Sequence, residues 1–169
     1  GADVTLVSGP VSIKAPLNVN RVSVETALDM LAACQTALPA DIFISVAAVA
    51  DWRPDDTSSI KIKKDKNGIP PLTLVENPDI LATLSRAENR PQLVVGFAAE
   101  TNDILAHSRA KLEKKSCDWI IANDVSGDVM GGDMNRMILV RQSGEEEWPH
   151  ESKQAAAKRL AAKIADEFS

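Results

Sequence analysis

The stretch "DIFISVAAVAD", residues 41–51, decides the fold. From Ile42 to Ala50 every residue except Ser45 is apolar. A strand that is apolar on both faces is typical of a parallel sheet whose two faces are covered by helices. The run ends in small residues and then reaches Asp51. We therefore predict a central parallel strand over 41–50 whose carboxyl end leads to this aspartate.

Further apolar runs and helical patterns alternate along the rest of the chain. The expected strands cover 2–8, 20–24, 72–75, 92–100 and 118–124, and a hairpin surrounds "MILVRQSGEEEW". Four helices are expected. The first carries the apolar stripe Ala27, Leu31, Cys34 and Leu38, and the second begins at Asn77 as N-cap with Pro78 following. The third spans 103–116, and the last carries the stripe Ala156, Leu160, Ile164 and Phe168. This alternation predicts an α/β fold with a Rossmann-like, mostly parallel sheet and helices on both faces. We expect a single domain over 1–169, with a loop or flap at about 55–70.

Composition narrows the class of protein. The chain has 169 residues, 44% of them apolar, and a net charge of −5, which argues against a general nucleic-acid-binding protein. No apolar run approaches the roughly 20 residues of a membrane helix. Cys34 and Cys117 suggest no disulfide scaffold, so a reducing, cytoplasmic setting is expected. The only histidines, His107 and His150, are too few for a zinc site and lack a convincing catalytic setting.

Three apolar runs end in the same way. "VAAVAD", "GFAAET" and "IANDV" pass through small residues to Asp51, Glu100 and Asn123. Ligands of open α/β sheets bind beyond the carboxyl ends of the strands, and small residues allow a close approach. Asp51 is expected either to bind a ligand or to cap a turn. Phe97 is expected to be either a core residue or a platform for a flat base.

Cationic and dipolar groups follow the expected strands. Lys61, Lys63, Lys64 and Lys66 lie in a stretch without apolar period, which is either a solvated loop or a flap that covers phosphates. Lys111 and Lys115 share a helix face, and the helix start at Pro78 presents free N–H groups. Together they indicate a nucleoside triphosphate site without a P-loop. Since no histidine base is evident, a reaction whose nucleophile is an ionised substrate carboxylate fits best, with charge stabilisation by lysines and a metal ion.

A resemblance to a known family unites these features. "VSGPVS", "AAVADWRP", "KIKK", "NPDIL", "VVGFAAET" and "KLEKKSCDWIIANDV" occur in this order. They closely resemble the synthetase domain of bacterial phosphopantothenoylcysteine synthetase, over essentially the whole chain. That family is a ligase of coenzyme A biosynthesis which joins 4′-phosphopantothenate to L-cysteine with CTP and Mg²⁺. The acid is activated as a phosphopantothenoyl-CMP intermediate with release of pyrophosphate, and the cysteine amine then displaces CMP.

The resemblance assigns roles to individual residues and implies partners. It implies that Lys61 is catalytic, and that the nucleotide is bound by Ser45, Val46, Ala47, Asp51, Lys61, Pro78, Asp79, Ile80, Leu81, Phe97, Lys111 and Lys115. It assigns no metal ligands. It further implies a homodimer through a small β extension, with "LTLV" and "MILVRQ" as candidate contact strands. A flavin-dependent decarboxylase domain often precedes this domain, so no flavin is expected here, and neither nucleic acid nor a membrane is an expected partner.

The sequence departs from the family pattern at its N-terminus. Gly1 is followed at once by an expected strand, and the family's Gly-rich opening and "ISN.SSGKMG"-like segment do not occur in the sequence. We therefore expect an N-terminally incomplete domain. If this chain is the entire polypeptide, we expect that it cannot complete catalysis even if it binds CTP; if it is a piece of a longer protein, we expect the full protein to be active. Two alternatives stay open: a nucleotide-dependent oxidoreductase on a Rossmann-like sheet, and a non-catalytic nucleotide-binding or dimerisation module. CTP-dependent and cysteine-dependent pyrophosphate release, absent with NADPH, separates the ligase from the oxidoreductase, and light scattering that shows a clean monomer counts against the dimerisation module.

Overall fold

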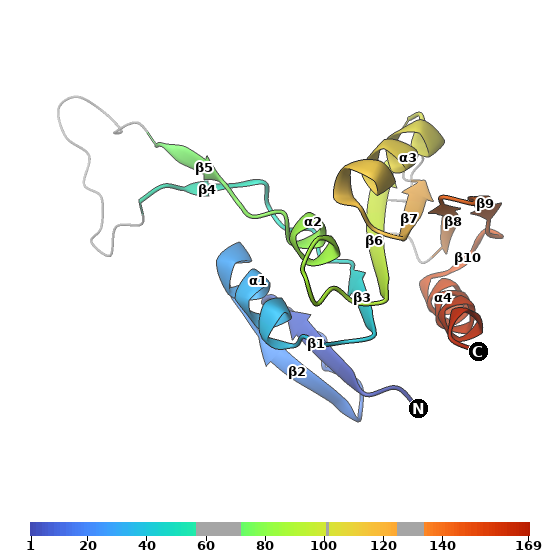
Figure 1. Cartoon of the computed structure of the whole chain (residues 1–169), viewed down its shortest axis with the longest axis horizontal. Coiled ribbons are helices and arrows are strands. Elements are labelled where there is room, and N and C mark those ends of the chain that lie inside the picture. Colours follow the sequence, from blue (N-terminus) through green and yellow to red (C-terminus); the bar gives the residue numbers. More distant parts are fainter. Residues whose placement is uncertain (57–71, 101, 125–133) are drawn as a thin grey trace. The chain divides into compact units, whose positions relative to one another are not determined.

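The structure is a computed structural model that describes residues 1–56, 72–100, 102–124 and 134–169 (Figure 1). The chain forms two compact units. The first comprises Gly1–Leu38 and Ala47–Thr83, and the second comprises Pro39–Val46 and Leu84–Ser169. Strands alternate with helices in both units, which confirms the expected α/β class. Among the helices of the described ranges, none is long and apolar enough to cross a membrane.

The first unit begins with two parallel strands and a helix. β1 (Val4–Ser8) pairs with β2 (Val19–Ser23) from Val4↔Val19 to Ser8↔Ser23. α1 (Ala27–Thr36) follows, and its first turn is held by a capping box. Thr26 Oγ1 accepts the Asp29 N–H at 3.1 Å, and the Asp29 carboxylate accepts the Thr26 N–H at 3.1 Å. The expected helix with its stripe from Ala27 to Leu38 is confirmed, although α1 ends at Thr36, and Cys34 of this stripe is buried.

The same unit contains an antiparallel ribbon. β4 (Trp52–Pro54) pairs with β5 (Leu74–Glu76), in the register Trp52↔Glu76 to Pro54↔Leu74 (Figure 1). β5 overlaps the strand expected at 72–75. β4 was not expected, because three residues that include a proline show no alternation. Trp52 is 54% exposed and therefore does not pack in a core.

The second unit is built on one six-stranded sheet, in which β3, β6 and β7 are parallel, β8 is antiparallel to β7, and β9 and β10 both pair with β8. The bounds are β3 (Ile42–Ser45), β6 (Leu93–Glu100), β7 (Trp119–Asp124), β8 (Met134–Arg141), β9 (Gly144–Glu147) and β10 (Glu151–Ser152). β3 lies at one end of the sheet and stops at Ser45. The expectation of a central strand over 41–50 is therefore wrong in position and length. Ile44 is 41% exposed and Val46 62%, so this end of the apolar run is not buried as a central strand would be.

Helices cover both faces of this sheet. Alternate residues of β6 and β7, such as Leu93, Val95 and Ile121, form a core with Ala156 and Leu160 of α4 (Lys153–Glu167). Residues between them in the strands point to the opposite face. Val94, Ile120 and Val140 are fully buried on that face, on which α3 (Ile104–Lys115) contacts β6, β7 and β8. The expected helices at 103–116 and near the C-terminus, and their positions on the two faces, are confirmed.

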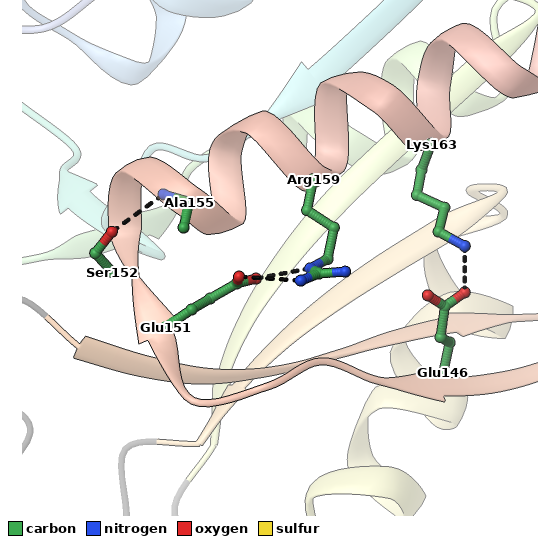
Figure 2. A network of polar contacts seen from close by, with 6 residues as sticks. All are labelled: Glu146, Glu151, Ser152, Ala155, Arg159 and Lys163. Atoms are coloured by element: carbon green, nitrogen blue, oxygen red, sulfur yellow. Dashed lines mark hydrogen bonds and ion pairs between the residues drawn. The ribbon is translucent and has the colours of Figure 1, made fainter.

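Ion pairs connect α4 to the antiparallel strands β9 and β10. Figure 2 shows Arg159 and Lys163 reaching from the helix to Glu151 and Glu146. Arg159 donates two hydrogen bonds to the Glu151 carboxylate, at 2.8 and 3.1 Å, and Lys163 Nζ lies 2.8 Å from Glu146 Oε2. Ser152 Oγ accepts the Ala155 N–H at 3.2 Å and caps the helix. These contacts place α4 on the sheet with a defined register.

The same pairs predict how stability changes with acid. The hydrogen bond from Arg159 holds the pKa of Glu151 below its usual range, and that from Lys163 does the same for Glu146. A carboxylate whose pKa is lowered by folding stabilises the fold above its unfolded pKa of about 4.3, and this contribution is lost as the pH falls through the folded pKa. We expect Arg159→Met to reduce the loss of stability between about pH 5 and pH 3, measured by urea unfolding at each pH. An unchanged slope in the variant would show that the Arg159–Glu151 pair does not contribute.

Candidate functional site

In the first unit, a hydrogen-bond cluster joins Asp51 to the segment before Pro78. The Asn77 N–H donates to the Asp51 carbonyl at 2.8 Å, and Asn77 Nδ2 donates to the Ala50 carbonyl at 2.8 Å. Arg53 Nη1 donates to the Glu76 carbonyl and, at 3.3 Å, to Asn77 Oδ1. Asn77 thus fixes the backbone of Asp51 beside the turn that leads to Pro78. Two segments that the resemblance assigns to the nucleotide are therefore neighbours.

The cluster also corrects the expected helix start. Asn77 was expected as the N-cap, but its side chain is occupied by Ala50 and Arg53. Asp79 provides the cap instead, since its Oδ1 accepts the Ala82 N–H at 3.0 Å and its carbonyl accepts the Thr83 N–H at 2.9 Å. α2 (Ile80–Ser85) accordingly begins two residues later than Pro78. A tertiary contact has displaced the local capping preference.

In the second unit, a lysine is held beside the end of β3. Ser45, the last residue of β3, pairs with Gly96 of β6. The next residue of β6, Phe97, is half-buried against the core, and its carbonyl accepts a hydrogen bond from Lys111 Nζ at 2.9 Å. Lys111 is half-buried on α3, so its charge is directed to this strand end rather than to solvent. The structure thus brings Ser45, Phe97 and Lys111 together.

The side chains of the other expected nucleotide-binding residues differ in their exposure to solvent. Val46, Ala47, Asp51 and Asp79 are exposed, whereas the side chains of Ile80 and Leu81 are buried. Ile80 and Leu81 can therefore meet a ligand only through their backbone. Lys115 lies one turn after Lys111, in the last turn of α3, and is half-buried. Lys61, like most of the expected flap, lies outside the described residues.

Sequence reasoning missed two residues of this region. Asn77 and Arg53 position the backbone around Asp51, yet neither was expected to do so. Asn77 was interpreted as a cap. Arg53 lies opposite Val75 only because β4 pairs with β5, and these two strands are far apart in the sequence. Within the described ranges, no group of three or more His, Cys, Asp or Glu side chains is placed to hold a metal ion.

The cysteines of the chain are buried free thiols. Burial raises the pKa of the Cys117 thiol to about 11 and also raises that of Cys34. Only the thiolate is nucleophilic, so neither sulfur is prepared for covalent catalysis. This agrees with the expectation that both are core residues.

Their reactivity is a direct test of this burial. We expect Cys117 and Cys34 to react with Ellman's reagent at pH 8 more than about tenfold more slowly than in the unfolded chain, because the native thiolate population is small. The time course is followed at 412 nm with and without urea. Rapid release of two equivalents from the native protein would contradict the burial of both thiols.

The fold and the strand-end geometry define an α/β protein of the Rossmann-like class. Its family follows from sequence comparison: residues 1–168 match the family described as DNA/pantothenate metabolism flavoprotein C-terminal domain. The chain belongs to this family, which confirms the resemblance drawn from the motifs.

Curated relatives agree with this assignment. The coenzyme A biosynthesis bifunctional protein CoaBC of Vibrio vulnificus (strain YJ016) is 47% identical over 169 residues, covering 97% of this chain and 42% of the relative. The protein of the same name from Escherichia coli (strain K12) is 42% identical, covering 99% of this chain and 43% of the relative. The chain thus spans less than half the length of these relatives.

Solved structures show the same fold. The C-terminal domain of a coenzyme A biosynthesis bifunctional protein CoaBC superposes with a TM-score of 0.79 at 34% identity, covering 99% of this chain and 76% of that one. A Cab2 mutant, H337A, in complex with phosphopantothenate-cysteine has a TM-score of 0.61 at 17% identity, covering 90% of this chain and 56% of that one. The second likeness supports the fold alone.

Proposed function

We propose that residues 1–169 form the nucleotide-binding and acid-activating part of a ligase that joins 4′-phosphopantothenate to L-cysteine at the expense of CTP. The observation that carries this proposal is family membership over residues 1–168, with CoaBC relatives 42% and 47% identical. No observation on the described residues favours the oxidoreductase.

The geometry supports a role for both residue groups. Asp51, with Ala47 and the segment Pro78–Leu81, presents one carboxylate and backbone groups to a nucleoside. Ser45, Val46 and Phe97 surround a strand end, and Lys111 and Lys115 supply cations for the phosphates. Lys61 is proposed, from the resemblance, to approach the triphosphate and to stabilise charge during transfer. Arg or Lys directed at phosphoryl oxygens stabilises the charge that develops there.

The proposed chemistry has two steps. A carboxylate oxygen of phosphopantothenate attacks the α-phosphorus of CTP, and the bond from that phosphorus to the leaving pyrophosphate breaks. The cysteine amine then attacks the acyl carbon of the mixed anhydride, the acyl–oxygen bond breaks, CMP leaves, and the amine loses a proton to solvent. The nucleophile of the first step is already ionised at neutral pH, so no histidine base is required.

A magnesium ion would bind at this site together with the nucleotide, mainly through the phosphates. Mg²⁺ in such sites keeps several waters and binds substrate phosphates with one or two carboxylates. Since the described part of the chain contains no group of three or more side chains placed to hold a metal ion, the phosphates would supply most ligands, and Asp51 and Asp79 are exposed carboxylates of the expected nucleotide segments. The ion would neutralise phosphate charge when bound.

We also propose a homodimer in which β5 contributes to the contact. Trp52, Leu72 and Leu74 expose large apolar side chains on the β4–β5 ribbon, which is unusual for a surface that stays in water. β8, the other candidate strand, pairs with β7 on one side and with β9 and β10 on the other, so its edges are occupied. Light scattering that gives only monomer at micromolar concentration would refute the dimer.

The activity is tested by pyrophosphate release with product analysis. We expect release to require CTP and phosphopantothenate, and mass spectrometry to detect phosphopantothenoylcysteine only when cysteine is added. The assay is run on this chain and on a form extended N-terminally to the length of the C-terminal domain structure. NADPH oxidation, or the absence of nucleotide dependence in the extended form, would overturn the proposal.

A further inference from the structure

One asparagine of the first unit joins the two segments that are proposed to contact the nucleotide there. These segments are the end of the apolar run at Asp51 and the turn Pro78–Leu81, which leads into α2. Asn77 directly precedes this turn, and its side chain is half-buried, whereas that of Asp51 is exposed. The Asn77 N–H donates to the Asp51 carbonyl at 2.8 Å, and Asn77 Nδ2 donates to the Ala50 carbonyl at 2.8 Å. A single residue thus binds two consecutive carbonyls.

These two hydrogen bonds fix the peptide unit between Ala50 and Asp51. A single bond would allow this segment to turn about the bond, whereas two bonds to consecutive carbonyls determine both its position and its direction. The backbone of Asn77 is itself restricted, because the following Pro78 disfavours the helical conformation for the residue before it. The place from which the Asp51 carboxylate extends is therefore set by Asn77.

Arg53 determines which way the Asn77 amide faces. Arg53 Nη1 donates to the Glu76 carbonyl and, at 3.3 Å, to Asn77 Oδ1. A guanidinium can only donate, so it binds the amide oxygen and leaves Nδ2 directed at the Ala50 carbonyl. Arg53 belongs to β4, and its partner strand β5 ends at Glu76, immediately before Asn77. Both ends of the Asn77 amide are therefore held.

We propose that Asn77 is a positioning residue of the ligase. Its amide keeps Asp51 and Pro78–Leu81 at the separation that one bound nucleotide spans, and it takes no part in bond making. This role rests on the proposed function, because it requires that both segments bind CTP. A site that is ordered before the ligand arrives loses less conformational entropy on binding. Removal of the amide should therefore weaken CTP binding, although no group that touches CTP is lost.

Asn77→Ala tests the amide without a change of charge. The main-chain bond to Asp51 remains, and the side-chain bond to Ala50 is lost. We expect the extended form of this variant to bind CTP about tenfold more weakly, the effect of one hydrogen bond, measured by isothermal titration calorimetry. Asn89→Ala is the same change at an exposed position outside the cluster, and its affinity should stay within about twofold of the parent.

A double-mutant cycle with Asp51 distinguishes positioning from a general loss of structure. If Asn77 acts by placing the Asp51 carboxylate, Asn77→Ala should weaken CTP binding by less than about threefold in an Asp51→Ala background, since residues that act as one unit are not additive. A purely structural role would give the same fold-loss in both backgrounds, together with a lower melting temperature. Equal losses would overturn the positioning role.

Arg53→Met provides a second variant if Asn77→Ala does not fold. It retains the apolar stem and removes the guanidinium that orients the Asn77 amide. We expect it to weaken CTP binding about threefold, with the same dependence on Asp51, because the amide is no longer held from its oxygen side. Unchanged CTP affinity in a folded variant refutes the role of Asn77.

The outcome separates this role from the proposed ligase. If the extended parent binds CTP but forms no phosphopantothenoylcysteine, the proposed reaction fails, and the affinities of the variants still decide the role of Asn77. If the parent is active and Asn77→Ala binds CTP as the parent does, the positioning role fails and the reaction stands. An extended parent that does not bind CTP would overturn both.

Discussion

Lys111→Met should raise the KM for CTP by about tenfold to hundredfold, the loss of one charge-assisted phosphate contact. Lys111 Nζ is fixed 2.9 Å from the Phe97 carbonyl, beside the end of β3, so its charge is already positioned for a phosphate before the nucleotide arrives. Methionine preserves the apolar stem and removes the ammonium. The extended form is assayed by pyrophosphate release at varied CTP.

The matched control is Lys114→Met on the same helix. Lys114 is exposed and was not assigned to the nucleotide, so its replacement should leave the KM within about twofold, as surface changes do. A purely structural role for Lys111 would lower the melting temperature without changing the KM for CTP, and that result would remove Lys111 from the proposed site.

Leu139→Ala should lower the free energy of unfolding by about 2–5 kcal/mol, measured by urea unfolding. Leu139 is 0% exposed in the core that α4 closes over the sheet, beside Ile121 and Trp148. Truncation removes buried methyl groups and leaves a cavity that a paired strand cannot close. β8 is paired on both sides, which restricts any collapse of the backbone.

Leu105→Ala is the same chemical change at a site that is 38% exposed. It should cost less than about 1 kcal/mol, because little apolar surface returns to water and no closed cavity forms. Equal losses in the two variants would contradict the description of the core on the α4 face of the sheet.

The elements that sequence predicted best are two strands buried on both faces and the helix between them. β6, β7 and α3 were expected within about two residues of their bounds, because continuous apolar runs and a helical stripe mark them clearly. β3 was expected too long and in the centre of the sheet, since apolar residues at a strand end look the same whether a sheet or a ligand covers them. β4 and β10 were missed because two or three residues carry no period.

The sequence predicted which residues belong to the candidate site better than it predicted how they contact one another. Small residues, Asp51 and the helix lysines were identified from strand ends and spacing. Two sets of hydrogen bonds join segments that are distant in the sequence, so no local pattern marks them. They run from Lys111 to the Phe97 carbonyl, and from Asn77 to the Ala50 and Asp51 carbonyls.

The central claim is that the carboxylate of the acid substrate attacks the α-phosphorus of a cytidine nucleotide. Phosphopantothenate labelled with ¹⁸O in both carboxylate oxygens is converted by the extended form in the presence of CTP and cysteine, and the released nucleotide is analysed by mass spectrometry. Our account predicts CMP that carries one ¹⁸O atom, with unlabelled pyrophosphate. Unlabelled CMP, or CDP together with ¹⁸O-labelled inorganic phosphate, would contradict it.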